Sequence, residues 1–206
     1  MIMTLPVEQV VLLDPDGTPV GSMDKTRVHG TDTPLHLAFS CYGFDRDGRM
    51  LLTRRSLGKQ TWPGVWTNTC CGHPSPGEDL ESAIRRRLRS ELGVEPTALR
   101  PVLPGFRYRA VAPDGVVENE VCPVYFAELP EDPDPAADEV MDWRWVDPAD
   151  FLRVVDAMPS VLSPWSVLQA VELRAAGILR SVNRDNRKGA TLATEATELR
   201  TRIVEE

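Results

Sequence analysis

The histidines are the feature that most constrains how this chain can fold. The sequence contains three of them, His29, His36 and His73. A second pair of potential ligands, Glu118 and Glu120, lies in a strand-like run, where residues two apart point to the same face. Three imidazoles and two carboxylates are a ligand set typical of a divalent metal. We therefore expect a fold that brings these five residues together.

Each part of this ligand set is ambiguous when taken alone. Two carboxylates on one face of a strand repel each other unless a positive charge lies between them, and a divalent cation is a natural partner. A solvent-exposed acidic edge is the simpler interpretation of a bare Glu-x-Glu. A lone histidine is likewise more often a surface or packed residue than a ligand. Taken together, nitrogen and oxygen ligands favour Mn²⁺, Fe²⁺, Zn²⁺ or Mg²⁺ over Ca²⁺.

Length and charge restrict the class of protein. A chain of 206 residues predicts a single domain, which we place at residues 1–182, followed by a helical or disordered polar tail at residues 183–206. The net charge of −8 argues against a nucleic-acid partner. No apolar run reaches the roughly 18 residues of a membrane span. The first residues lack a signal-peptide pattern, and the four cysteines lack disulfide spacing, which predicts a reduced, cytoplasmic protein.

Periodicity and turn residues predict an α+β domain in which helices flank a mixed β-sheet. The predicted strands are residues 7–14, 35–44, 50–53, 66–71, 105–111, 117–129 and 140–146. The predicted helices are residues 78–92, 148–159 and 164–179. Gly93 follows the first helix and favours its termination. The apolar side of the last helix is predicted to consist of Val167, Leu168, Val171 and Ala175.

A further pattern begins at Gly72 and runs through the first predicted helix. It consists of Gly72, Glu78, Arg86, Leu88, Glu91, Gly93 and Val94. This pattern resembles the Nudix box, a loop–helix–loop that binds a diphosphate through divalent metal. Arg87 and Ser90 stand where the box has acids, and Glu91 alone remains of its adjacent glutamates. The resemblance therefore implies a Nudix fold, while the missing acids argue against pyrophosphate hydrolysis.

The surrounding residues narrow the resemblance to one family. The run Thr61-Trp-Pro-Gly-Val-Trp-Thr-Asn68, followed by Cys71-Gly-His-Pro74, closely resembles the type I isopentenyl-diphosphate isomerases. Further matching elements follow in the family's order: His29-x6-His36, Arg54-Arg55, Lys59, Ser90-Glu-Leu-Gly93, Tyr108, Glu118-x-Glu120 and Trp165. The resemblance covers roughly residues 7–179, nearly everything except the tail.

This resemblance implies an isomerase of isoprenoid precursor biosynthesis. Such an enzyme interconverts isopentenyl and dimethylallyl diphosphate by protonation and deprotonation through a tertiary carbocation. The implied catalytic residues are Cys71, Glu120, Tyr108 and Trp165. The implied substrate-binding residues are Lys25, Arg55, Lys59, Arg87 and Trp66. The metal ligands are His29, His36, His73, Glu118 and Glu120 for one divalent ion and Glu91 for another.

The resemblance also implies partners and individual roles. The histidine site would hold Mn²⁺, Mg²⁺ or Zn²⁺, and Glu91 a Mg²⁺ that arrives with the diphosphate. Cys71 and Glu120 would exchange protons with the substrate. The π face of Trp165 would lie against the developing cation. The expected partner is a small prenyl diphosphate, bound by a monomer without nucleic acid or membrane.

Simpler interpretations and other classes of protein stay open at this point. Arg87 and Glu91 are four residues apart on a helix and can form a plain salt bridge. A Nudix hydrolase of a nucleoside diphosphate derivative would have an intact Arg-Glu-x-x-Glu-Glu helix. A domain with a structural metal would have thiolate ligands. A flavin-dependent isomerase would have a glycine-rich binding signal, and none stands out.

Overall fold

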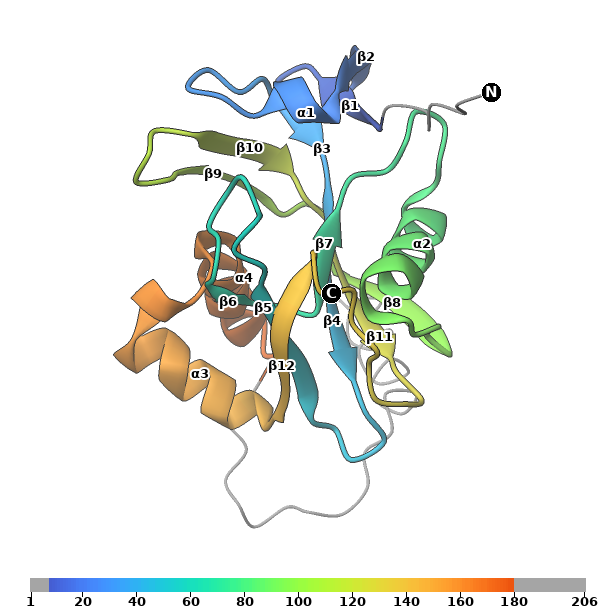
Figure 1. Cartoon of the computed structure of the whole chain (residues 1–206), viewed down its shortest axis with the longest axis vertical. Coiled ribbons are helices and arrows are strands. Elements are labelled where there is room, and N and C mark those ends of the chain that lie inside the picture. Colours follow the sequence, from blue (N-terminus) through green and yellow to red (C-terminus); the bar gives the residue numbers. More distant parts are fainter. Residues whose placement is uncertain (1–7, 180–206) are drawn as a thin grey trace, which may run out of the picture.

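Two β-sheets and the helices packed on them make up the fold, which the computed structural model describes over residues 8–179 (Figure 1). The five-stranded sheet has the order β2 (Pro19–Asp24), β1 (Gln9–Leu13), β3 (His36–Leu37), β10 (Val117–Val121) and β9 (Arg107–Val111). The seven-stranded sheet has the order β12 (Val140–Val146), β5 (Met50–Arg55), β4 (Phe39–Phe44), β11 (Val124–Glu128) and β8 (Ala98–Leu103), with β6 (Trp66–Thr67) paired to β5 and β7 (Cys70–Gly72) to β4. The helices are α1 (Lys25–Val28), α2 (Leu80–Leu92), α3 (Pro148–Ala157), the short 3₁₀ helix η1 (Pro159–Val161) and α4 (Pro164–Ala175).

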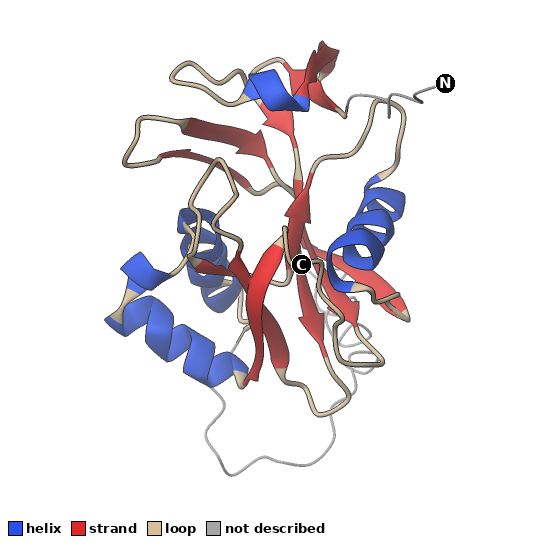
Figure 2. Cartoon of the chain, viewed as in Figure 1, coloured by secondary structure: helices blue, strands red, loops and turns tan. Residues whose placement is uncertain are grey.

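Helices cover both faces of the seven-stranded sheet (Figure 2). Strand β4 alternates between them: Phe39 and Cys41 pack in the core under α2, whereas Tyr42 and Phe44 pack in the core under α3 and α4. Each sheet also combines parallel and antiparallel pairs, since β3 lies parallel to β10 and β4 parallel to β11. The predicted α+β class and mixed strand arrangement are therefore confirmed.

Two predicted strands each divide between the two sheets. Residues 35–44 form β3 and β4 on either side of Ala38, and residues 117–129 form β10 and β11 on either side of residues 122–123. The two crossing segments run side by side, because the Ala38 N–H donates to Val121 O at 2.9 Å and the Ser40 N–H to Pro123 O at 3.0 Å. Pro123 has no N–H for a ladder, which favours a break there. The sequence pattern showed the extended backbone but not this change of sheet.

The predicted helices are confirmed, with small differences at their ends. Helix α2 begins after Asp79, whose side chain accepts from the Ser82 N–H, and ends at Gly93 with a φ of 66°. This left-handed conformation favours glycine at the end of a helix. Helix α4 ends at Ala175 rather than at residue 179, since Gly177 also adopts a left-handed φ of 69°.

The predicted apolar side of α4 is wrong for three of its four residues, since Val167 alone packs against the core. Leu168 and Val171 are 45% and 47% exposed, whereas the buried residues of this helix are Trp165, Ser166, Gln169, Ala170 and Leu173. The helix buries polar side chains that find hydrogen-bond partners inside the protein, so hydrophobicity alone indicates the wrong face.

The short helix α1 and two edge strands were not predicted from the sequence. Strands β2 and β8 each lie at the end of a sheet. Strand β8 contains Pro101, which an edge strand tolerates because its outer N–H groups need no partner. The strands are held by backbone pairing rather than by an alternating apolar pattern, so periodicity does not reveal them.

Some predictions concern properties that the described residues do not test. The boundary at residue 182 and the tail at residues 183–206 lie outside residues 8–179. None of the helices within residues 8–179 is long and apolar enough to cross a bilayer. The monomeric state and the cytoplasmic location stay predictions.

Two identical substitutions on α4 test which face is buried. We expect Leu173→Ala to lower the free energy of unfolding by about 2–5 kcal/mol, because Leu173 is fully buried. Leu168→Ala should cost less than about 1 kcal/mol, because that side chain is largely exposed. Denaturant unfolding of both variants measures the difference, and equal losses would contradict the observed face.

Candidate functional site

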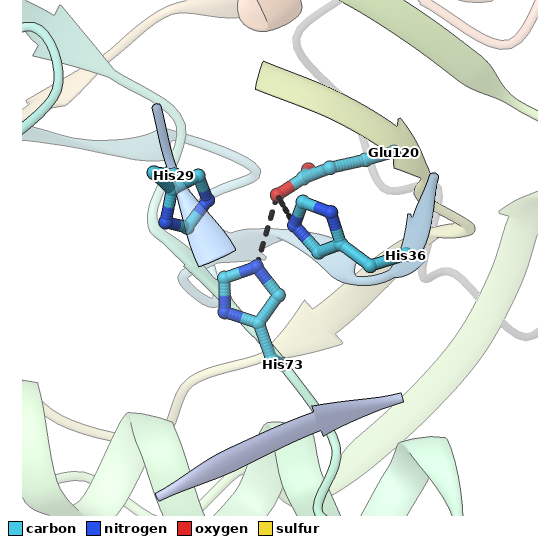
Figure 3. Close-up of side chains that lie close together, drawn as sticks. All are labelled: His29, His36, His73 and Glu120. Carbon is cyan, nitrogen blue, oxygen red and sulfur yellow. Dashed lines mark hydrogen bonds and ion pairs between the residues drawn. The ribbon is translucent and has the colours of Figure 1, made fainter. Parts of the chain in front are cut away.

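Three histidines and one glutamate converge beside the point where the strands cross between sheets. Figure 3 shows their side chains pointing toward one another. One ligand atom of each lies within 4.8 Å of the others. They come from separate segments: His29 from the end of α1, His36 from β3, His73 from the loop after β7, and Glu120 from β10. The predicted grouping of the histidines with Glu120 is therefore present in the fold.

The parallel pairing of β3 with β10 sets one of these contacts. His36 and Glu120 are Cα partners in that pairing, and His36 Nε2 lies 3.4 Å from Glu120 Oε1. The same Oε1 lies 3.0 Å from His73 Nε2 (Figure 3). His36 Nδ1 donates to Pro34 O at 2.9 Å, because a carbonyl can only accept. In the neutral imidazole, Nε2 therefore carries the lone pair, as in a metal-binding histidine.

Glu118 lies at the edge of the same group. Its Oε2 is 2.9 Å from His29 Nε2. Neither of these buried atoms has a well-aligned hydrogen-bond partner, and the same is true of His36 Nε2. Buried polar atoms are nearly always paired, since an unpaired one costs free energy. A metal ion held by the three histidines and Glu120 would satisfy His29 Nε2 and His36 Nε2, so these four residues fit the predicted divalent ion. Glu118 lies outside this converging group, and its role as a ligand stays a prediction.

The charge states of the group also suit a metal. Burial raises the pKa of the Glu120 carboxyl, but the contacts from His36 and His73 outweigh burial and hold the pKa well below its usual value. Burial keeps the pKa of His73 below its usual value despite the contact with Glu120. Burial also acts to lower the pKa of His36, but the contact with Glu120 outweighs burial and raises that pKa. The group therefore offers an ionised carboxylate and a neutral His73, and His36 would give up its proton on binding a metal.

A cavity of about 270 Å³ lies next to this group. Its walls contain the four predicted catalytic side chains Cys71, Tyr108, Glu120 and Trp165. They also contain the four predicted cations Lys25, Arg55, Lys59 and Arg87. His29, His73, Glu91 and Glu118 line it as well, while His36 is fully buried behind it. The fold thus gathers nearly all of the predicted site around one cavity.

Trp66 is the exception. The residues that line the cavity, within the described part of the chain, do not include it. The Trp66 backbone pairs with Arg54 and accepts from the Ser163 N–H at 2.8 Å, and its side chain packs against the core under α3 and α4. The role of Trp66 in substrate binding stays a prediction.

The pleat of β7 turns its two cysteines to opposite sides: Cys70 packs in the core under α2 and Cys71 against the core under α3 and α4, and both line the cavity. The Cys71 Sγ lies 3.3 Å from Ser40 Oγ and 3.2 Å from Asn68 Oδ1. Burial raises the pKa of this thiol to about 11, more than these hydrogen bonds lower it. At neutral pH Cys71 is therefore protonated and can donate a proton.

Tyr108 and Trp165 lie on the same wall. Tyr108 is the Cα partner of Glu120 in the pairing of β9 with β10. Its ring centroid is 6.0 Å from that of Trp165, which meets Trp62 edge-on at 5.6 Å. Burial, reinforced by the charge of Glu120, raises the pKa of the Tyr108 hydroxyl well above its usual value. The hydroxyl is therefore a proton donor beside a carboxylate.

Three of the four predicted cations of the cavity are already paired with acids, whereas Arg55 donates to Thr61 O and Trp62 O. Lys59 contacts Glu139, Arg87 contacts Glu91, and Lys25 Nζ lies 2.5 Å from Glu8 Oε2. Arg87 also lies 3.6 Å from Glu139. Gly72 lets α2 approach β7 this closely, since a Cβ there would lie 3.0 Å from Arg87 Cγ. The helix therefore places Arg87 and Glu91 on the cavity wall together.

Sequence reasoning missed several residues that contact this site. Glu139 lines the cavity and holds Lys59, but it stands in an acidic loop that gives no signal of its own. Ser40, Asn68 and Gln169 form a fully buried polar layer beneath Cys71. A polar residue within an apolar strand, such as Ser40, was the available signal.

Comparison with known proteins identifies relatives of this chain. Residues 34–165 match the NUDIX domain family. The isopentenyl-diphosphate Delta-isomerase of Frankia alni is 59% identical over 162 residues, or 79% of this chain and 84% of that protein. The isopentenyl-diphosphate Delta-isomerase of Leifsonia xyli subsp. xyli is 58% identical over 176 residues, or 84% and 95%. The solved MutT protein of Methanosarcina mazei shares the fold, with a TM-score of 0.56 and 16% identity over 70% of this chain and 96% of that one.

The fold and the site define a Nudix-domain protein with a candidate metal site of histidine and glutamate side chains. Within that class, the chain belongs to the isopentenyl-diphosphate Delta-isomerase family. The family predicted from the sequence is confirmed. The roles of the individual site residues stay predictions.

Replacing one histidine tests the metal site directly. We expect His36→Gln to lower the affinity for Mn²⁺ or Zn²⁺ by at least about tenfold, because it removes the lone pair of a buried ligand. Competition with a chromogenic chelator measures the affinity, and Cys71→Ala is the control because it alters the same cavity without removing a predicted ligand. An unchanged affinity in His36→Gln would contradict the assigned ligand.

Proposed function

We propose that this protein interconverts isopentenyl diphosphate and dimethylallyl diphosphate by adding a proton to an alkene and removing one from a neighbouring carbon. One observation carries the proposal: the cavity holds a thiol whose pKa is raised and a carboxylate whose pKa is lowered. Environments that shift the pKa values of two titratable groups in opposite directions supply an acid and a base at the same pH.

Cys71 and Glu120 are the proposed acid and base. An unactivated alkene is a poor base, so the acid must be held against it in a site that excludes water. In the forward direction the Cys71 thiol gives its proton to the terminal alkene carbon, and a tertiary cation forms at the adjacent carbon. Glu120 takes a proton from the next carbon, and the double bond forms there. In the reverse direction the two residues exchange roles, and the Tyr108 hydroxyl assists at Glu120.

Trp165 is the proposed stabiliser of the cation. An aromatic face within reach of a desolvated positive charge contributes on the order of 1–2 kcal/mol. The Arg55 guanidinium already lies 5.3 Å from the centroid of this ring, so the ring position suits a cation. The rings of Trp62 and Tyr108 beside it exclude water that would capture the intermediate.

Lys25, Arg55, Lys59 and Arg87 are the proposed diphosphate ligands, because their charges line the same cavity. Glu91 is the proposed ligand of a Mg²⁺ that comes with the diphosphate. The histidines with Glu118 and Glu120 would hold the other divalent ion. These metals would neutralise phosphate charge and fix the position of the Glu120 carboxylate.

A Nudix hydrolase is the alternative that the fold allows. Glu78 of the box is bound to Arg86, with Glu78 Oε1 2.8 Å from Nε, and Arg87 replaces an acid at the cavity wall. The remaining Glu91 alone is a poor match for a hydrolytic metal cluster. Release of phosphate or nucleotide without isomerisation would support this alternative instead.

Isomerisation in deuterated water tests the proposed function. We expect the metal-loaded wild-type protein to convert isopentenyl diphosphate with deuterium entering the product, because the added proton comes from an exchangeable group. Cys71→Ala should lose at least about 100-fold in kcat, since it removes the acid. Product analysis by mass spectrometry measures both, and an inactive wild-type protein would contradict the proposal. Activity that survives in Cys71→Ala would assign the acid to Tyr108 and Glu120.

The pH dependence of substrate capture tests Lys59. Burial lowers the pKa of this ammonium to about 8, although Glu91 opposes the shift. Lys59 therefore loses its charge as the pH rises through about 8, and kcat/KM should fall over that range. In Lys59→Arg the guanidinium stays protonated, so this decline should disappear. Initial rates between roughly pH 6 and pH 10 measure the decline in kcat/KM. An identical decline in both proteins would contradict a role of Lys59 in substrate capture.

A further inference from the structure

The Asn68 side chain is held in one orientation in the fully buried segment between β6 and β7. Its Nδ2 donates to Cys41 O at 3.0 Å and to Cys70 O at 2.9 Å. Carbonyl oxygens accept only, so this pair of contacts identifies the nitrogen and fixes the direction of Oδ1. The amide therefore presents its oxygen toward the cavity side of β7.

Three donors meet at that oxygen. The Trp165 Nε1–H donates at 3.1 Å, the Cys71 thiol at 3.2 Å and the Thr67 hydroxyl at 2.9 Å. The indole N–H can only donate, so its contact defines the direction of the Trp165 ring. One side-chain oxygen thus touches both the proposed acid and the proposed cation stabiliser.

The third donor extends the arrangement to the helix that carries Trp165. Thr67 Oγ1 lies 2.8 Å from Ser163 Oγ, and Ser163 is the N-cap of α4. Trp165 stands in the first turn of that helix, so the contact ties the start of α4 to the segment around Asn68. Thr67 and Asn68 together therefore position both the Trp165 ring and the backbone that bears it.

We propose that Asn68 is a positioning residue for the isomerisation. It holds the Cys71 thiol and the Trp165 ring in a fixed relative position. The thiol then faces the carbon that receives the proton while the ring faces the adjacent cationic carbon. This inference rests on the proposed function. It assigns to Asn68 no contact with the substrate, because Asn68 is absent from the cavity lining within the described residues.

The proposal predicts a loss in kcat without a loss in binding. Asn68→Ala removes the shared acceptor, while the contacts of the predicted diphosphate ligands do not involve Asn68 and stay in place. A small misplacement of reacting groups costs roughly 100-fold in rate. We therefore expect kcat to fall by roughly that factor with KM within about twofold of the wild type.

A core variant controls for general destabilisation. Val155 is buried in α3, away from the cavity lining. Val155→Ala lowers stability through packing alone, so it shows what a lower melting temperature does to kcat. A kcat of Asn68→Ala that stays within twofold of Val155→Ala, or a KM that rises in parallel with the loss, would overturn the proposal.

The indole N–H of Trp165 gives a readout that is independent of turnover. The signal of this N–H in a ¹H–¹⁵N spectrum is the one that disappears in Trp165→Phe. The wild-type N–H should exchange slowly with solvent, and Asn68→Ala should shift the signal and accelerate its exchange. Rapid exchange in the wild type would overturn the proposal, and this measurement holds even if Asn68→Ala does not fold.

A double-mutant cycle separates coupling from two independent losses. If Asn68 acts through Trp165 and Cys71, Trp165→Phe should cost less in kcat in the Asn68→Ala background than in the wild type. Strictly multiplicative losses would count against the link. An inactive wild-type protein would instead overturn the proposed function, while an active enzyme with a freely exchanging indole would overturn the positioning role alone.

Discussion

The side-by-side passage of two strands from one sheet to the other determines where the functional groups of this protein lie. Strands β3 and β10 pair in the five-stranded sheet, and their continuations β4 and β11 pair in the seven-stranded sheet. His36 and Glu120 stand just before this crossing, and β7 adds Cys71 beside Ser40 just after it. The metal group and the thiol are therefore neighbours because a parallel register continues through the crossing.

The same crossing creates two different environments within one cavity. Glu120 receives contacts from His36 and His73, which stabilise its charge, whereas Cys71 faces neutral partners that do not overcome the effect of burial. A thiol already binds its proton more tightly than a carboxyl does, and the two environments widen that difference.

The chemistry of this site was more predictable from sequence than its architecture. Helix α2 was predictable because its signals are local: the helical spacing of its apolar residues and Gly93 just after its end. The histidine group was predictable because few residue types bind metals. The change of sheet at Ala38 and Pro123 was not, because extended backbone looks the same in either sheet. The buried face of α4 was misjudged because Gln169 and Ser166 are buried through hydrogen bonds, which a hydrophobic pattern does not register.

The ion pairs that line the cavity have a consequence for selectivity. Since Lys59 and Arg87 already neutralise Glu139 and Glu91, a phosphate anion alone would gain two cations and leave two carboxylates without partners. With the proposed ligands, an anion that carries its own divalent cation would avoid that cost, because the carboxylates would take the metal as the basic groups take the phosphate. Binding would therefore break the ion pairs of the empty cavity and give each charged group a new partner. Binding of the metal and of the diphosphate should then be mutually dependent. Such a site discriminates by the combined charge of what enters it, and a bare monophosphate would be a poor occupant.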